Sequence, residues 1–254
     1  MTRMNTAEEL GHLLGDAYAQ RAVQVAVPAR LAPPDSDAAY QAQQAFLRRR
    51  QLGIGGWKIG AKSPDGPIQG APLPRQGIHT SGAALARSDF PVLGIELEVM
   101  FRFGRDFLPG APAVTEQDIL ASIASVGASI EIVSSRLAGW PEAPRLNQLA
   151  DLQNHGALIL GPFIDYRDDF AFDAPQATLQ LNGQSIFSGP SANPAGDPRR
   201  LLPWLVDHCR RHAIALPAGT VITAGSYTGM YFPKKPGTVT GRIAGLPAVT
   251  FAIT

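Results

Sequence analysis

The stretch from Gly94 to Gly104, GIELEVMFRFG, limits most strongly what this chain can fold into. Apolar residues alternate with other residues from Ile95 onward, which is the pattern of a β-strand with one buried face. Glu96 and Glu98 stand two residues apart, so their side chains project to the same side of that strand. Neighbouring carboxylates repel each other, and a buried pair must share a proton or bind a cation. A hard divalent metal ion is the simplest cation that could neutralise such a pair.

Glu131 is a third candidate acid, in the strand-like run SIEIV from Ser129 to Val133. If this run pairs with the first strand or lies against it, Glu96, Glu98 and Glu131 could converge on one ion. Oxygen ligands without nearby His or Cys suit Mg²⁺ or Mn²⁺ better than zinc. The alternative, from spacing alone, is that the acids are ordinary exposed residues of half-buried strands with Lys or Arg neighbours.

Four short motifs occur in order along almost the whole chain. They are GGWKIGAK from Gly55 to Lys62, the pair Glu96 and Glu98, the single Glu131, and TAGSYTG from Thr223 to Gly229. In this combination the chain resembles the 2-keto-4-pentenoate hydratase and 4-oxalocrotonate decarboxylase family of the fumarylacetoacetate hydrolase superfamily. The resemblance implies a distorted mixed β-roll or barrel flanked by helices, with an N-terminal helical segment.

The resemblance also implies roles for residues. In the family, the acids that match Glu96, Glu98 and Glu131 hold Mg²⁺ or Mn²⁺, and the lysine that matches Lys58 lines the active site. Lys58 is therefore expected to be catalytic and to move protons. Its glycine neighbours would let it stand close to a buried ligand, whereas the alternative is a lysine that reaches solvent from a strand.

The implied substrate is a short 2-oxo or 2-hydroxydienoic acid from the catabolism of aromatic compounds. A hydro-lyase would add water to give a 4-hydroxy-2-oxo acid, with the metal as a Lewis acid beside the C2 oxygen. One departure bears on this reaction, because Arg75 in APLPRQGI stands where hydratases carry an acidic residue. The alternatives are decarboxylation of a 2-oxo-dioate of the 4-oxalocrotonate type, C–C hydrolysis, or a non-catalytic relative that binds a dicarboxylate or a metal.

Two further candidates are basic residues. His79 lies in a Pro- and Gly-rich stretch, residues 63–86, which is expected to form a lid or pocket wall. Its imidazole could transfer protons, or it could be a solvated loop histidine. Arg136 could hold a substrate carboxylate or a second carboxylate, or pair with a strand neighbour.

Polar turns supply the remaining candidates. Asn154 and His155 lie in a turn that approaches the active site in the family. Ser226 and Thr228 combine hydroxyls with free backbone N–H groups and could bind a substrate carboxylate. The alternative for both is a plain turn whose hydroxyls bond to its own backbone.

Local patterns predict the secondary structure. Helices are predicted over residues 5–21, 35–50, 115–126, 146–153 and 199–212, from apolar residues three or four apart. Short apolar runs predict strands over residues 129–133, 157–160, 220–224, 238–243 and 248–253, and Asn182-Gly183 predicts a tight hairpin. Strands before, between and after helices favour an α+β fold. Residues 1–52 are expected to form a helical segment that packs on a catalytic domain of residues 53–254.

Composition narrows the possible partners. A net charge of +1 gives no support for binding to nucleic acid or an anionic membrane. No run approaches the ~20 apolar residues that span a bilayer. The single cysteine, Cys209, fits a reducing cytoplasm, where we expect this protein. The family resemblance implies a homo-oligomer.

Overall fold

A curled seven-stranded sheet lies at the centre of the computed structural model, which describes residues 5–254. Its strand order is β2-β1-β10-β5-β6-β7-β3, and a second sheet has the order β4-β12-β11-β8-β9. The strands are β1 (Ile54–Gly60), β2 (Gln69–Pro74), β3 (Ile78–Thr80), β4 (Ala84–Leu85), β5 (Gly94–Phe103), β6 (Ile123–Val133), β7 (His155–Asp165), β8 (Ala177–Leu181), β9 (Gln184–Ser185), β10 (Val221–Ser226), β11 (Gly237–Ile243) and β12 (Val249–Ile253).

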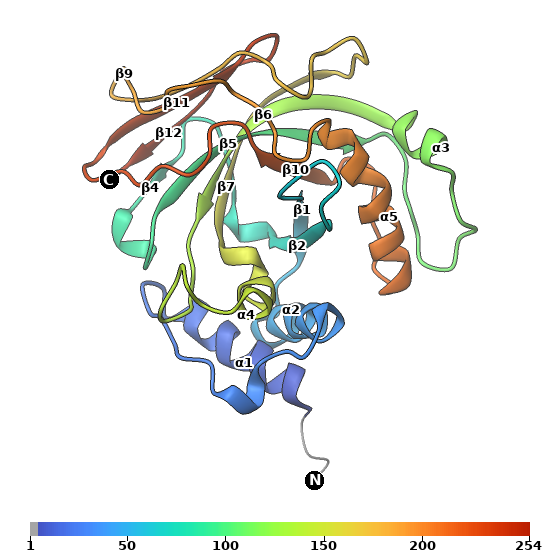
Figure 1. The fold of residues 1–254 in the computed structure, drawn as a ribbon, viewed down its shortest axis with the longest axis vertical. Helices are drawn as coiled ribbons and strands as arrows, with labels where there is room; N and C mark the ends of the chain where they lie inside the picture. The colour runs from blue at the N-terminus through green and yellow to red at the C-terminus, as the bar shows by residue number, and fades with distance from the viewer. Residues whose placement is uncertain (1–4) are drawn as a thin grey trace.

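The helices lie outside the two sheets (Figure 1). They are α1 (Thr6–Ala19), α2 (Ser36–Arg50), α3 (Glu116–Leu120), α4 (Arg145–Ala150) and α5 (Leu201–Arg211). The helices α1, α2 and α4 gather at the end of the molecule opposite the second sheet, and α3 and α5 lie together at one side. None of the helices in residues 5–254 is both long enough and apolar enough to cross a membrane.

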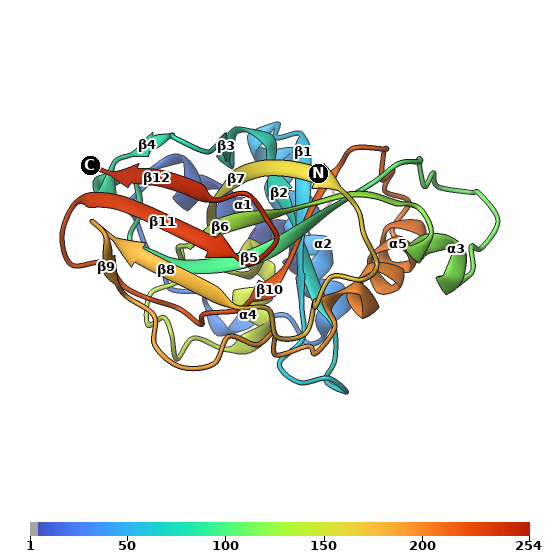
Figure 2. The same ribbon diagram turned by 90° about the horizontal axis from the view of Figure 1, so that it is seen from above.

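The main core lies between the two sheets, which Figure 2 shows one above the other. Leu97 of β5 and Ile130 of β6 project from the same face and pack with residues of the second sheet. Glycine at position 241 of β11 allows the sheets to approach closely. A Cβ there would lie 2.5 Å from Leu97 Cδ1 and 3.4 Å from Ile130 Cδ1.

The N-terminal helices form a second apolar cluster. Leu10, Leu14 and Phe46 of α1 and α2 pack there with Ala71 of β2 and Leu152, which follows α4. One buried amide strengthens this contact. Gln43 Nε2 of α2 donates to the carbonyl oxygens of Leu149 at 2.7 Å and Gly70 at 3.3 Å.

The α+β class, the N-terminal helical pair and the Asn182-Gly183 hairpin are as the sequence predicts. Both turn residues have positive φ, 52° and 76°. One predicted helix is wrong. The helix expected over residues 115–126 ends at Leu120, and the β-branched residues after it pair within β6. The stretch 63–86, expected to form a lid or pocket wall, contains β2, β3 and β4, and Gln76, Gly77 and His79 of this stretch line a cavity.

Candidate active site

Register between β5 and β6 brings the three acids together. Glu96 stands opposite Glu131 in this antiparallel pair, and Glu98 stands opposite Ser129. Carboxylate oxygens of Glu96, Glu98 and Glu131 lie within 4.8 Å of one another. Glu98 is only 3% exposed and Glu131 is fully buried, so they are not ordinary solvated strand residues.

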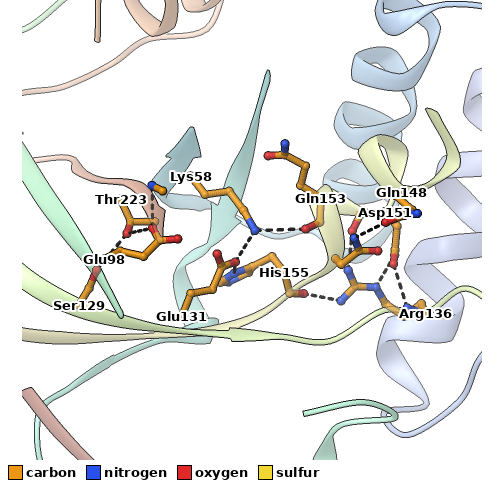
Figure 3. A network of polar contacts seen from close by, with 12 residues as sticks. Lys58, Glu98, Ser129, Glu131, Arg136, Gln148, Asp151, Gln153, His155 and Thr223 are labelled. Carbon is orange, nitrogen blue, oxygen red and sulfur yellow. Dashed lines mark hydrogen bonds and ion pairs between the residues drawn. The ribbon is translucent and has the colours of Figure 1, made fainter. Parts of the chain in front are cut away.

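Hydrogen bonds from the protein hold one oxygen of Glu131 and leave the other without a partner. Glu131 Oε1 accepts from Lys58 Nζ at 2.6 Å and lies 3.0 Å from His155 Nδ1 (Figure 3). Burial lowers the pKa of His155. An ionised carboxylate can only accept, so Nδ1 of His155 is the donor in this contact. Glu131 Oε2 is buried without a hydrogen-bond partner among the described residues.

Glu98 is held in the same way from the opposite side. Its Oε2 accepts from Thr223 Oγ1 and from the backbone N–H of Gly225, the latter at 3.2 Å. Thr223 is itself fixed by Ser129, whose Oγ lies 2.9 Å from Thr223 Oγ1. The protein therefore orients these two acids by one oxygen each.

The acids differ in their affinity for protons. Burial and repulsion from Glu131 raise the pKa of Glu96 to about 7. Burial and repulsion from Glu131 and Glu96 raise the pKa of Glu98 to about 8. Burial also disfavours the charged form of Glu131, but Lys58 and His155 outweigh it and hold the pKa of Glu131 below its usual value.

Lys58 remains a cation despite its burial. Burial alone lowers its pKa, but attraction to the carboxylates of Glu131, Glu98 and Glu96 outweighs burial and raises the pKa. When all three acids are ionised, they and the Lys58 ammonium carry a combined charge of −2. A divalent cation balances that charge, and the unpartnered Glu131 Oε2 is an oxygen that it could bind. The residues thus fit a hard divalent metal ion.

Ser226 and Thr228 lie beside the acids. Ser226 stands opposite Glu98 in the pairing of β10 with β5, and Thr228 Oγ1 accepts from Leu97 N at 3.3 Å. Both hydroxyls also donate to Gly229 O, at 3.3 and 3.2 Å. They lie on the segment that pairs with β5 beside the acids, and they also bond to their own turn.

His79 and Arg136 do not join the acids. His79 stands beside Ile159 in register, whereas Glu131 stands beside Leu158, so the two side chains project from opposite faces of the sheet. His79 lines a separate cavity of about 430 Å³. His79 therefore lies apart from the acids, because its position within the short strand β3 decides which face its side chain reaches.

Arg136 is buried in an ion pair with Asp151 and donates to the carbonyl oxygens of Asp151 and His155, each at 2.6 Å. This corresponds to the alternative of a protein partner for Arg136. Asn154 is also engaged within the protein, since its Nδ2 donates to Gln148 Oε1 at 3.0 Å. Arg75, on the surface, donates to Ile54 O at 3.4 Å.

Sequence reasoning missed three residues around the acids. Thr223 lies within the TAGSYTG motif, and its position two residues before Gly225 on a buried strand is a sign that could have been used. Gln153, whose carbonyl accepts from Lys58 Nζ at 3.2 Å, and Asp151 carry no comparable sign. Their placement depends on an unusual turn that local sequence does not predict.

No family model matches the chain. The 2-keto-4-pentenoate hydratase of Paraburkholderia phymatum is 29% identical to it, over 98% of this chain and 98% of that protein. The protein of the same name from Burkholderia vietnamiensis is 28% identical, over 93% of this chain and 94% of its own. These similarities extend through all four motifs.

A solved structure shares the fold. The 4-oxalocrotonate decarboxylase from Pseudomonas putida G7 superposes with a TM-score of 0.84, over 98% of this chain and 97% of its own, at 19% identity. The expected mixed β-roll with flanking helices is confirmed by this likeness. The full-length relatives bear out the resemblance to the 2-keto-4-pentenoate hydratase and 4-oxalocrotonate decarboxylase family of the fumarylacetoacetate hydrolase superfamily, and the solved structure shows a shared fold.

Proposed function

We propose that the protein is a metal-dependent hydro-lyase that adds water to a short 2-hydroxydienoate and forms a 4-hydroxy-2-oxo acid. One observation carries this proposal: three acids and a lysine cluster on one face of a buried sheet, in a chain similar throughout its length to 2-keto-4-pentenoate hydratases. The substrate class is that of the catabolism of aromatic compounds.

Glu96, Glu98 and Glu131 would hold Mg²⁺ or Mn²⁺. Magnesium is present in the solved decarboxylase, and manganese in a fumarylpyruvate hydrolase from Pseudomonas aeruginosa. Bound there, the ion supplies electrophilic stabilisation of negative charge on a substrate oxygen. Glutamate oxygens that the protein already orients need little rearrangement to receive it.

Lys58 would transfer protons through Nζ. Its raised pKa keeps it protonated, so it can donate to the substrate and recover a proton afterwards. Ser226 and Thr228 would bind the substrate carboxylate. The same sheet face continues into the apolar side chains of Met100 and Leu158, which suit the hydrocarbon end of a dienoate.

Decarboxylation of a 2-oxo-dioate is the main alternative, and C–C hydrolysis would use the same group of residues. A dioate needs a cation for its second carboxylate. Arg136 donates to Asp151 and His155, and Arg75 lies on the surface, so neither supports this alternative. Hydration of a substrate with one carboxylate agrees better with this arrangement.

The direct test uses chelator-treated protein and 2-hydroxypenta-2,4-dienoate. Loss of the dienol absorbance only after addition of Mg²⁺ or Mn²⁺, with 4-hydroxy-2-oxopentanoate as product, is the expected result. No loss in a sample that still binds Mg²⁺ would contradict the hydratase proposal. Dioate substrates would then be tested for loss of CO₂ or C–C cleavage.

Two variants separate an enzyme from a non-catalytic relative. Glu98→Gln and Lys58→Ala should each abolish turnover in an enzyme. In a protein that only binds a dicarboxylate or metal, Glu98→Gln alone should change ligand affinity.

Three further predictions rest on sequence. They are a division of the chain between residues 52 and 53, assembly as a homo-oligomer, and a location in the cytoplasm, where the buried thiol of Cys209 would remain free.

A further inference from the structure

Three consecutive residues after α4 have left-handed backbone. Leu152, Gln153 and Asn154 have φ angles of 48°, 53° and 59°, and none of them is glycine. Side chains with a Cβ disfavour this region, so such residues persist only where the surroundings hold them. We call residues 152–154 the left-handed turn. It lies directly between α4 and β7.

Arg136 bonds to the residue on each side of the turn. Its Nη2 donates to Asp151 O and its Nη1 to His155 O, each at 2.6 Å. Nε forms an ion pair with the Asp151 carboxylate, which also accepts the backbone N–H of Arg136 at 2.9 Å and the hydroxyl of Ser135 at 3.2 Å. Arg136 is 4% exposed and Asp151 fully buried, so water competes little for these bonds.

The left-handed turn and the residue after it each make one contact with the reactive cluster. The carbonyl of Gln153 accepts from Lys58 Nζ at 3.2 Å. His155, the next residue but one, donates from Nδ1 to Glu131 Oε1 at 3.0 Å. Figure 3 shows the chain of contacts from Arg136 and Asp151 through this turn to Lys58 and Glu131. A relaxed turn would redirect the Gln153 carbonyl and the His155 ring together.

We propose that Arg136 and Asp151 are positioning residues that hold the left-handed turn and thereby orient Lys58 and Glu131. The effect on catalysis rests on the proposed function. The effect on the turn itself does not. Arg136 acts here without touching the substrate, since its donors face Asp151 and His155.

The test uses Arg136→Lys and Asp151→Asn in the full-length protein. Arg49→Lys is the matched control, because Arg49 also pairs with an aspartate, Asp16, but on the surface. Amide hydrogen exchange over residues 151–156 should become at least tenfold faster in both variants and stay unchanged in the control. With Mg²⁺ present, kcat should fall about 10–100-fold, the range for partners that orient reactive groups, while KM changes less than threefold.

A second substitution distinguishes positioning from general loss of structure. Glycine adopts positive φ without strain, so Gln153→Gly should restore the left-handed turn even when the bonds between Arg136 and Asp151 are weakened. The double variant Asp151→Asn with Gln153→Gly should have a kcat at least threefold above that of Asp151→Asn alone, and its amide exchange over residues 151–156 should be slower. Added to Lys58→Ala, Gln153→Gly should recover nothing. The single variant Gln153→Gly is measured alongside, and the recovery in the double variant is expressed relative to its kcat.

Several outcomes would overturn the proposal. Faster exchange without a fall in kcat would show that the turn does not position the reactive groups. A fall in kcat that matches the unfolded fraction, or no recovery with glycine, would show that the pair only stabilises the fold. If neither variant folds, Ser135→Ala removes one bond to Asp151 and the acceptor of the Leu137 N–H, and it must show both effects to a smaller extent. A wild-type protein without turnover would refute the proposed function, while the exchange measurements would still test the turn.

Discussion

The two faces of the β5–β6 pair differ in the chemistry of their side chains. Leu97 and Ile130 project into the apolar core between the sheets, while Glu96 and Glu131, one residue away along each strand, project into a cluster of charges. The apolar face is buried, and on the acidic face Glu131 is buried and Glu96 is half-buried. One face therefore stabilises the fold through contact with apolar side chains, and the other holds like charges that repel each other.

Burial on the two faces of one strand therefore has opposite effects on the free energy of the folded state. The apolar face lowers the free energy of the folded state, whereas the acidic face raises it until a proton or a cation neutralises the charges. Substitutions on the two faces should consequently affect different measurements.

The largest expected effect is from Glu98→Gln. Loss of this oxygen ligand should weaken Mn²⁺ binding by at least about 100-fold, since even partners of metal ligands contribute 10–100-fold. The metal-free protein should not lose stability, because the pKa of about 8 means that Glu98 is largely protonated at pH 7 and glutamine has the same shape. Titration of Mn²⁺ followed by electron paramagnetic resonance measures the affinity, and urea unfolding measures the stability. Unchanged affinity would remove Glu98 from the proposed metal site.

The opposite face gives the matched experiment. Leu97→Ala, one residue away, should lower the free energy of unfolding by about 2–5 kcal/mol, the usual range for a buried leucine. The affinity of the folded variant for Mn²⁺ should stay within threefold of the wild type. A loss of affinity as large as that of Glu98→Gln would show that the two faces are not independent.

The dependence on pH sharpens the same comparison. The pKa values of Glu96 and Glu98 in the folded protein are about 7 and about 8, above the usual value of 4.5. The folded metal-free protein therefore retains protons that the unfolded chain releases, and its stability decreases as pH rises from about 4.5 to 8. Each group contributes at most about 1.4 kcal/mol per pH unit.

A bound divalent cation removes this penalty, so the increase in Tm on adding Mg²⁺ should be larger at pH 8.5 than at pH 6. Differential scanning calorimetry with and without chelator measures it. In Glu98→Gln the dependence of the metal-free protein on pH should be weaker. An increase in Tm that does not vary with pH would contradict the assigned proton affinities.

The smallest expected effect is from His79→Ala. His79 projects from the face opposite the acids, so kcat for the dienoate should change less than about twofold. Lys58→Ala, measured in parallel, provides the contrasting loss. A tenfold decrease in kcat for His79→Ala would bring this residue back into consideration as a proton donor.

The acids could be predicted because a period of two along a strand fixes which side chains share a face. Pairing of Glu96 with Glu131 could not be predicted, since register depends on contacts between distant segments. The same limit applies to His79, because the pairing of β3 with β7 determines the side of the sheet to which its side chain projects. The family resemblance predicted the importance of Lys58, whereas the residues that bond to it could be identified only in the structure.

The left-handed turn shows a second limit. Leucine and glutamine have no preference for positive φ, so nothing in the local sequence predicts Leu152 and Gln153 there. A helix over residues 146–153 was the natural expectation, and the structure ends α4 at Ala150. Hydrogen bonds from Arg136, which is distant in sequence, hold the left-handed turn in place of a continued helix. Similarly, the residues after Leu120 join a strand because β5 and β7 offer partners on both sides.

The amide of Gln43 has a consequence for protein engineering. By bonding to Leu149 O and Gly70 O, it joins α2 both to the helix before the left-handed turn and to the sheet that carries Lys58. A truncated chain that begins at residue 53 would lose this joint and uncover the apolar side chains of Leu149 and Leu152. The first two helices are thus not a detachable module, and grafting the reactive cluster onto another scaffold would require them to move with it.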